Sequence, residues 1–176
     1  MTKSKINETL PKLVRRIDKL LKKHAKHKGI IHCHSYHIGK FIKNNSKYAS
    51  RLLLHTSKNR DIMLNKHATA TKRTVLLSPS MSEGVDLKDD ASRFQIICKI
   101  PYPYLGDELV NRKRELWTWW YTYETVKKII QSLGRSIRNE TDFATTYILD
   151  EGWWSFYCEN KQLFPSDFEK QFVKRK

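Results

Sequence analysis

The segment Gln131-Ser-Leu-Gly-Arg-Ser-Ile-Arg138 follows a run in which apolar residues recur at helical spacing. The apolar positions of the run and the segment are Val126, Ile129, Ile130, Leu133 and Ile137. If one helix continues through the segment, Gln131, Arg135 and Arg138 share the face opposite the apolar one. An amide and two guanidinium groups on one rigid face can bind phosphate oxygens, although a solvated basic helix face has the same pattern.

Further segments stand before and after this one. They are Gly29-Ile-Ile-His-Cys-His-Ser-Tyr36, Thr74-Val-Leu-Leu-Ser-Pro-Ser-Met-Ser-Glu-Gly-Val-Asp86, Lys99-Ile-Pro-Tyr-Pro-Tyr-Leu-Gly-Asp107 and Thr141-Asp-Phe-Ala-Thr-Thr-Tyr-Ile-Leu-Asp150. Together with Q-x-x-G-R-x-x-R, they resemble motifs IV, V and VI and the neighbouring segments of superfamily 2 helicases in the XPD/DinG form. The resemblance runs in order from about residue 28 to residue 152. It implies the second RecA-like domain of a DNA helicase.

The resemblance also implies roles for individual residues. Arg135 and Arg138 would approach the phosphates of ATP as arginine fingers, and Gln131 would sense the γ-phosphate region. The other residues implied to face the nucleotide are Glu83, Gly84, Asp86 and Gly134. The residues implied to contact single-stranded DNA, through loop hydroxyls, backbone N–H groups and ring stacking, are Ser35, Tyr36, Ser80 and Met81.

Two motifs that a complete ATP site needs do not occur in the sequence. It has neither a G-x-x-x-x-G-K-[ST] loop to hold the β- and γ-phosphates nor a D-E-x-[HD] pair to hold magnesium. We therefore expect the site for ATP with Mg²⁺ to be completed by a first RecA-like domain. That domain would belong to the same parent chain or to a separate subunit of a phage-like split helicase. The isolated chain should then lack ATPase activity, and the resemblance implies 5′→3′ movement on single-stranded DNA.

The charge of the chain points to a polyanionic partner. Its 176 residues carry a formal net charge of +16, with 39% hydrophobic and 11% aromatic residues, which is typical of a packed, basic globular domain. A stand-alone nucleic-acid-binding protein that kept the fold without a motor is the alternative, and an unrelated α/β enzyme is a third. We expect a soluble, cytoplasmic protein with no membrane partner, because no apolar run is long enough to cross a bilayer.

Alternating apolar strands and helices predict an α/β fold with a mostly parallel central sheet, in three layers if it is RecA-like. Strands are expected at 30–35, 51–56, 74–78, 94–100 and 145–149, with helices at 6–24, 36–44 and 60–67 and one or two helices within 108–138. Thr9 is expected to cap the first helix. We treat 1–176 as one domain, with a basic amphipathic helix within 1–27 and a helical tail at 153–176 that has a cap signal at Pro165-Ser-Asp167.

Three other groups of residues have structural interpretations. Cys33, Cys98 and Cys158 form no C-x-x-C pair, so we expect no disulfide framework or zinc site, and buried free thiols in the strands. His32 and His34 would share a strand face, yet they lack a second ligand pair, so no metal site is predicted. The aromatic residues at Trp117, Trp119, Trp120, Tyr121 and Tyr123 favour core or domain-interface packing over base stacking.

Overall fold

A computed structural model of the chain describes residues 6–79, 87, 89–133 and 143–172. The α-helices are α1 (Ile6–Lys23), α2 (Tyr36–Asn45), α3 (Arg60–Thr69), α4 (Glu108–Leu116), α5 (Thr118–Leu133) and α6 (Trp153–Glu159). The strands are β1 (Gly29–His32), β2 (Leu52–Leu54), β3 (Val75–Ser78), β4 (Phe94–Ile97) and β5 (Thr145–Ile148). Short 3-10 turns are η2 (Ala49–Arg51), η3 (Asp89–Ala91), η5 (Lys161–Leu163) and η6 (Phe168–Gln171). Among these described helices, none is long and apolar enough to span a bilayer.

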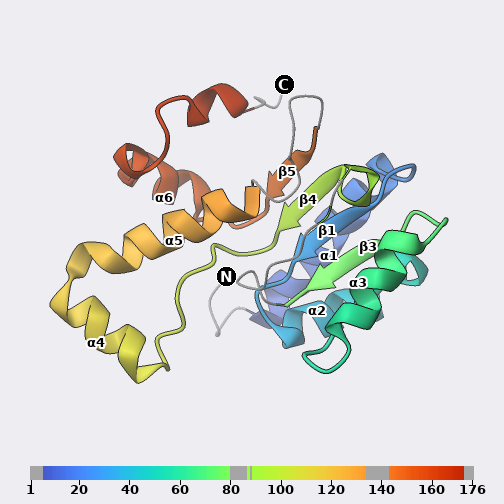
Figure 1. The fold of residues 1–176 in the computed structure, drawn as a ribbon, viewed down its shortest axis with the longest axis horizontal. Helices are drawn as coiled ribbons and strands as arrows, with labels where there is room; N and C mark the ends of the chain where they lie inside the picture. The colour runs from blue at the N-terminus through green and yellow to red at the C-terminus, as the bar shows by residue number, and fades with distance from the viewer. Residues whose placement is uncertain (1–5, 80–86, 88, 134–142, 173–176) are drawn as a thin grey trace.

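The strands form one parallel sheet in the order β2-β3-β1-β4-β5 (Figure 1). The predicted α/β class, the parallel sheet and the five strand positions are thereby confirmed. The central strands β1, β3 and β4 are buried throughout, as their continuous apolar runs indicate for a sheet covered on both faces.

Alternate residues of the strands pack on opposite faces of the sheet. On one face, Ile31, Leu77 and Ile96 pack with the apolar stripes of α1 and α2. On the other face, Ile30 and Leu76 contact α3 through its partly buried apolar residues. The end of α5 also lies against the sheet, since the Gln95 Nε2 atom donates to the carbonyl oxygen of Leu133 at 3.4 Å and to Thr146 Oγ1 at 2.8 Å.

A second apolar core joins α5, α6 and the C-terminal 3-10 turns, which lie together on one side of the sheet in Figure 1. Its aromatic members are Tyr102, Trp153, Phe156, Tyr157, Phe164, Phe168 and Phe172. Tyr157 is 2% exposed, and its ring centroid lies 5.1 Å from that of Phe164. The predicted helical tail is therefore one short helix followed by turns, and burial of aromatic rings holds these pieces against α5.

Several predicted boundaries were wrong. α1 begins at Ile6, so Thr9 lies inside the helix and does not cap it. The helix accommodates Pro11 in its second turn because burial of the apolar stripe that starts at Leu10 stabilises it. β1 ends at His32 and β4 at Ile97, both earlier than predicted. Of the one or two helices predicted within 108–138, the structure has two, α4 and α5, with Trp117 between them; this prediction is not contradicted, and the part beyond Leu133 lies outside the described residues. Asp167 precedes η6 without a side-chain capping bond.

The aromatic residues near the start of α5 differ from the prediction in part. Trp119 is 62% exposed, and Trp117 and Tyr123 are also exposed. The prediction that these three residues pack in the core of this chain is therefore wrong. Tyr121 does pack inside the domain, where its hydroxyl donates to the carbonyl oxygen of Pro103 at 3.0 Å and its ring stacks on Tyr102. A role in a domain interface stays a prediction.

Candidate functional site

The carboxyl ends of the parallel strands define one edge of the sheet, where ligands bind in open α/β folds. After β1, the chain continues beside its neighbours, because Cys33 N donates to the carbonyl oxygen of Ser78 at 2.8 Å. The next residue, His34, has a φ of 66°, in the left-handed region that few residues other than glycine adopt. The backbone turns at this point and brings Ser35 to the start of α2.

The left-handed conformation of His34 corrects one sequence-based expectation. His32 and His34 do not share a strand face, because β1 ends at His32 and the turn begins two residues later. His32 is buried, whereas His34 is half-buried. Burial lowers the pKa of His34, and the positive charges of Lys99 and Lys128 lower it further. In the described part of the chain, no three His, Cys, Asp or Glu side chains gather as a metal site would require.

Ser35 and Tyr36 lie together at this edge, as the sequence predicted for motif IV. Ser35 is the N-cap of α2, and its Oγ atom accepts a hydrogen bond from Ile38 N at 3.2 Å. The cap leaves the O–H group of Ser35 as a donor toward a ligand. Tyr36 follows in the first turn with 45% of its surface exposed, so its ring is accessible for stacking.

The segment predicted to be motif V begins at the same edge, on the neighbouring strand. Ser78 ends β3, which pairs directly with β1, and its Oγ atom lies 3.5 Å from His55 Nε2 at the end of β2. The remaining predicted residues of this motif lie outside the described residues; they are Ser80, Met81, Glu83, Gly84 and Asp86. The structure therefore fixes where this segment starts, and the roles of its residues stay predictions.

The helix that precedes the predicted motif VI is described as far as Leu133. Val126 and Ile129 are buried as the periodicity predicted, and Gln131 is exposed on α5. Ser132 is buried and donates to the carbonyl oxygen of Lys128 at 2.7 Å. Gly134, Arg135 and Arg138 lie outside the described residues, so the shared face proposed for Gln131 and the two arginines is untested.

Asp150 is a structural residue of this edge that sequence reasoning did not single out. Its Oδ2 atom accepts from Ile100 N at 3.1 Å, and its Oδ1 atom accepts from Gly152 N at 3.0 Å. The carboxylate thus ties the turn after β5 to the segment after β4. Its signal in the sequence was its position directly after an apolar strand, where a carboxylate often binds backbone N–H groups of a turn.

Cys33 and Cys98 are buried free thiols, as predicted for cysteines in apolar strands, and burial raises the pKa of Cys33. They continue β1 and β4, since Cys98 N donates to the carbonyl oxygen of His32 at 3.0 Å. Cys158 is also a free thiol but is exposed.

Comparison with known proteins identifies a type of domain. The sequence model described as the helicase C-terminal domain matches residues 17–170. The regulator of telomere elongation helicase 1 homolog of Caenorhabditis elegans is 33% identical over an alignment of 101 residues, which covers 48% of this chain and 10% of that protein. The ATP-dependent DNA helicase CHL1 of Candida albicans is 29% identical over an alignment of 114 residues, which covers 53% of this chain and 14% of that protein. The chain spans only about a tenth of the length of these relatives.

Solved structures show the same fold at lower sequence identity. An apo structure of XPD has a TM-score of 0.66 at 18% identity and covers 85% of this chain and 33% of that one. Xpd4 of S. tokodaii has a TM-score of 0.62 at 18% identity, with 89% and 33% covered. The C-terminal domain of S. cerevisiae Dbp5 has a TM-score of 0.60 at 10% identity, with 93% and 82% covered. These likenesses confirm the predicted RecA-like architecture.

Proposed function

Because the chain belongs to the helicase C-terminal domain family, in its XPD/DinG form, we propose that it is the second motor domain of an ATP-dependent DNA helicase. The observation that carries the proposal is the meeting of Ser35, Tyr36 and the end of β3 at the carboxyl edge of one parallel sheet. The names of its relatives include ATP-dependent DNA helicases, which supports ATP with Mg²⁺ as the cofactor.

In the proposed mechanism, this domain completes an ATP site without holding the triphosphate alone. A first RecA-like domain grips the phosphates and Mg²⁺, and Arg135 and Arg138 neutralise charge that develops during phosphoryl transfer. Gln131 stands four residues before Arg135 in the sequence and contacts the γ-phosphate region. Glu83, Gly84, Asp86 and Gly134 line the nucleotide; Gly84 permits a close backbone approach.

The same edge supplies part of a track for single-stranded DNA. The Ser35 hydroxyl donates to a phosphate oxygen while its lone pair continues to cap α2, and the Tyr36 ring stacks on a base. Ser80 and Met81, just beyond β3, extend the contact. Closing of the two motor domains around ATP and opening after hydrolysis would move this track along the strand, with 5′→3′ polarity.

A reconstituted ATPase tests the motor role. The isolated chain should show no phosphate release above background with single-stranded DNA, and addition of a matching first RecA-like domain should restore turnover. Arg135→Ala should then lower kcat by about 10³-fold or more, the typical cost of losing an arginine finger. Arg15→Ala, on the exposed face of α1, is the matched control. Turnover by the isolated chain would contradict the division of the site between two domains.

Fluorescence anisotropy with a single-stranded oligonucleotide tests the track. Tyr36→Ala should weaken binding by about 5- to 100-fold, as expected for the loss of one stacked base. Tyr36→Phe keeps the ring and should bind like the wild type. Equal affinities for all three proteins would remove Tyr36 from the contact surface.

A further inference from the structure

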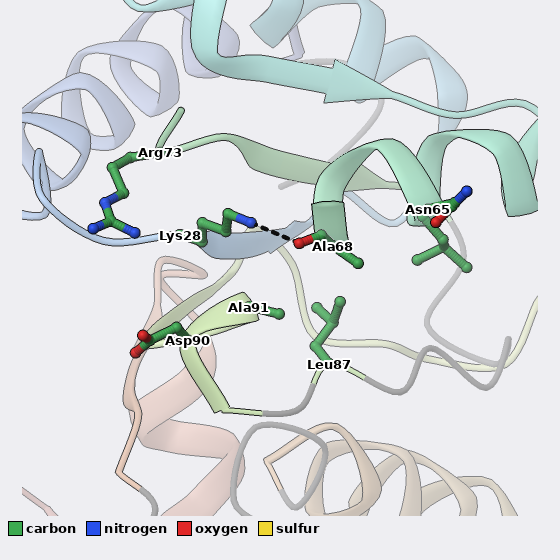
Figure 2. A pocket seen from close by; sticks show the side chains of 8 residues that line it. Lys28, Asn65, Ala68, Arg73, Leu87, Asp90 and Ala91 are labelled. Atoms are coloured by element: carbon green, nitrogen blue, oxygen red, sulfur yellow. Dashed lines mark hydrogen bonds between the residues drawn. The ribbon is translucent and has the colours of Figure 1, made fainter. Parts of the chain in front are cut away.

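A basic hollow lies at the amino edge of the sheet, opposite the edge described above. Its volume is about 510 Å³, and a smaller hollow of about 190 Å³ adjoins it through shared lining residues. Lys28, Arg73 and Asp90 line both. Figure 2 shows Arg73 and Asp90 toward one side of the larger hollow and Asn65 with Leu87 toward the other. The amino edge therefore has a concave site of ligand size.

Positive side chains converge here from segments far apart in the sequence. Lys28 precedes β1, Arg73 precedes β3 and Arg93 precedes β4. Lys26 and His27 add to the smaller hollow. Parallel strands bring these segments together, because their amino ends lie side by side in register. An anion in the hollow would relieve the mutual repulsion of these cations.

Within the described residues, Asp90 is the acidic side chain that lines the hollows. It pairs with Arg93 Nε at 2.9 Å, and this arginine lowers the pKa of Asp90, with smaller effects of Arg73 and His27. One carboxylate thus faces several cations, so the charge of this lining is positive on balance.

The lysine in the hollow is held in place by the fold. Lys28 is 6% exposed, and its Nζ atom donates to the carbonyl oxygens of His67 at 2.8 Å and Ala68 at 2.9 Å. These carbonyls belong to the last turn of α3, where a cation is favourable. Neutral carbonyls leave the charge of Lys28 in place, and an ammonium group carries a third donor.

The other wall of the hollow is apolar. It consists of Leu64, Ala68, Leu87 and Ala91, with the amide of Asn65 beside them. A site with cations at one end and an apolar wall at the other fits a phosphate ester whose organic part is flat or hydrophobic. Inorganic phosphate would use only the charged end of such a site.

We propose that this hollow binds a phosphomonoester, with the phosphate at Arg73 and Lys28 and the organic part against Leu64 and Leu87. A nucleoside monophosphate has this chemistry, either free or as the 5′ end of a nucleic-acid strand. The phosphate end of this site is separate from Ser35 and Tyr36, which lie at the opposite edge of the sheet.

Calorimetric titration at 150 mM salt tests the proposal on the whole chain, with inorganic phosphate and AMP as probes. AMP should bind at least tenfold more tightly than inorganic phosphate, because only AMP reaches the apolar wall. Arg73→Glu should weaken AMP binding at least tenfold, and Arg73→Lys should keep most of it. Arg15→Glu makes the same charge change on the exposed face of α1 and should alter binding less than twofold.

A second pair of probes separates the two sources of the ligand. Oligonucleotides of one sequence, with a 5′-phosphate or a 5′-hydroxyl, are compared on wild type and Arg73→Glu. A preference for the 5′-phosphate that disappears in Arg73→Glu identifies a strand end as the ligand. Binding of AMP that depends on Arg73 without such a preference identifies a free nucleotide.

Three results would overturn the proposal. One is no AMP binding at millimolar concentration, and another is equal weakening by Arg73→Glu and Arg15→Glu, which would indicate a net-charge effect. The third is AMP binding that is lost in Arg135→Ala and kept in Arg73→Glu. That result would place AMP at the motor site, so it would reject the hollow and support the proposed function.

Discussion

Tyr36 and Arg51 lie at opposite edges of the same sheet. The side chain of Tyr36 is exposed, whereas that of Arg51 is bound to backbone carbonyl groups of the fold. Tyr36 follows β1 at the carboxyl edge and has 45% of its surface exposed. Arg51 precedes β2 at the amino edge, and its guanidinium group donates to the carbonyl oxygens of Leu21 at 2.8 Å, His24 at 3.1 Å and His27 at 3.0 Å. Its Nε atom also donates to the carbonyl oxygen of Arg73 at 2.8 Å.

The contacts of Arg51 show that the formal net charge of +16 is not all available to a partner. Lys28 and Arg51 bind backbone carbonyls at the ends of α3 and α1, and Lys43 donates to the carbonyl oxygens of Ala49 and Leu52, both at 2.6 Å. Such cations satisfy carbonyls that a helix end or turn leaves without intrahelical partners. Part of the positive charge therefore stabilises the fold, and only the remainder is available to a polyanion.

Among the charged side chains at the amino edge, Arg51 has the largest expected effect on stability. Arg51→Met should lower the free energy of unfolding by about 2–4 kcal/mol, because partly buried carbonyls at the end of α1 lose charged donors. Arg51→Lys should have an intermediate effect, since a lysine cannot span the same set of carbonyls. Urea denaturation followed by tryptophan fluorescence measures both.

Arg15→Met is the control for Arg51, since Arg15 is exposed on α1. It should change stability by less than about 0.5 kcal/mol, as is usual for surface substitutions. If Arg51→Met were as mild as Arg15→Met, the amino edge would not depend on this arginine, and the contrast with Tyr36 would fail.

An intermediate effect is expected from His67, which is buried behind the amino-edge hollow. Its Nε2 atom donates to the carbonyl oxygen of Ala91 at 2.8 Å, and its Nδ1 atom lies 2.9 Å from Thr74 Oγ1, whose hydroxyl donates to Nδ1 when the ring is neutral. Burial lowers the pKa of His67, and the positive charge of Lys28 lowers it further. As pH falls below about 6.5, the unfolded chain binds a proton that the folded chain resists.

Stability should therefore decrease between pH 7.5 and pH 5.5, by roughly 1 kcal/mol for this one histidine. His67→Gln keeps a donor and an acceptor without a titrating group, and it should flatten that part of the pH dependence. His24 and His34 also have pKa values lowered mainly by burial, so some dependence should remain. A pH dependence identical in wild type and His67→Gln would contradict the assignment.

Periodicity was enough to predict the sheet, and motif order was enough to expect Ser35 and Tyr36 at its carboxyl edge; their binding roles stay predictions. Buried strands such as Val75–Ser78 have continuous apolar runs, and Ser35 precedes a helical stripe as an N-cap should. The same reasoning could not find the contacts of Lys28, Arg51 and Asp150. Each of these binds backbone atoms of segments distant in sequence, and residue identity alone does not show whether a charge is solvated or bound to a carbonyl.

The aromatic surface of α4 and α5 gives the smallest expected effect on stability. These helices follow the segment that leaves the carboxyl end of β4, and Leu109 and Trp119 are 63% and 62% exposed on them. Trp119→Ser should change the free energy of unfolding of the isolated chain by less than about 0.5 kcal/mol, because little apolar area leaves a buried environment. Tyr157→Ala, in the core of α5 and α6, should cost about 3–5 kcal/mol by comparison.

Both variants are measured by the same urea denaturation. A loss above about 1.5 kcal/mol for Trp119→Ser would show that its ring supports the fold. A small loss in the free energy of unfolding would show that Trp119, which is exposed like Tyr36, contributes little to the stability of the fold. Trp119 and Tyr123 are both exposed, with ring centroids 5.9 Å apart, and neighbouring exposed aromatic rings are typical of a contact surface; the predicted contact is another domain.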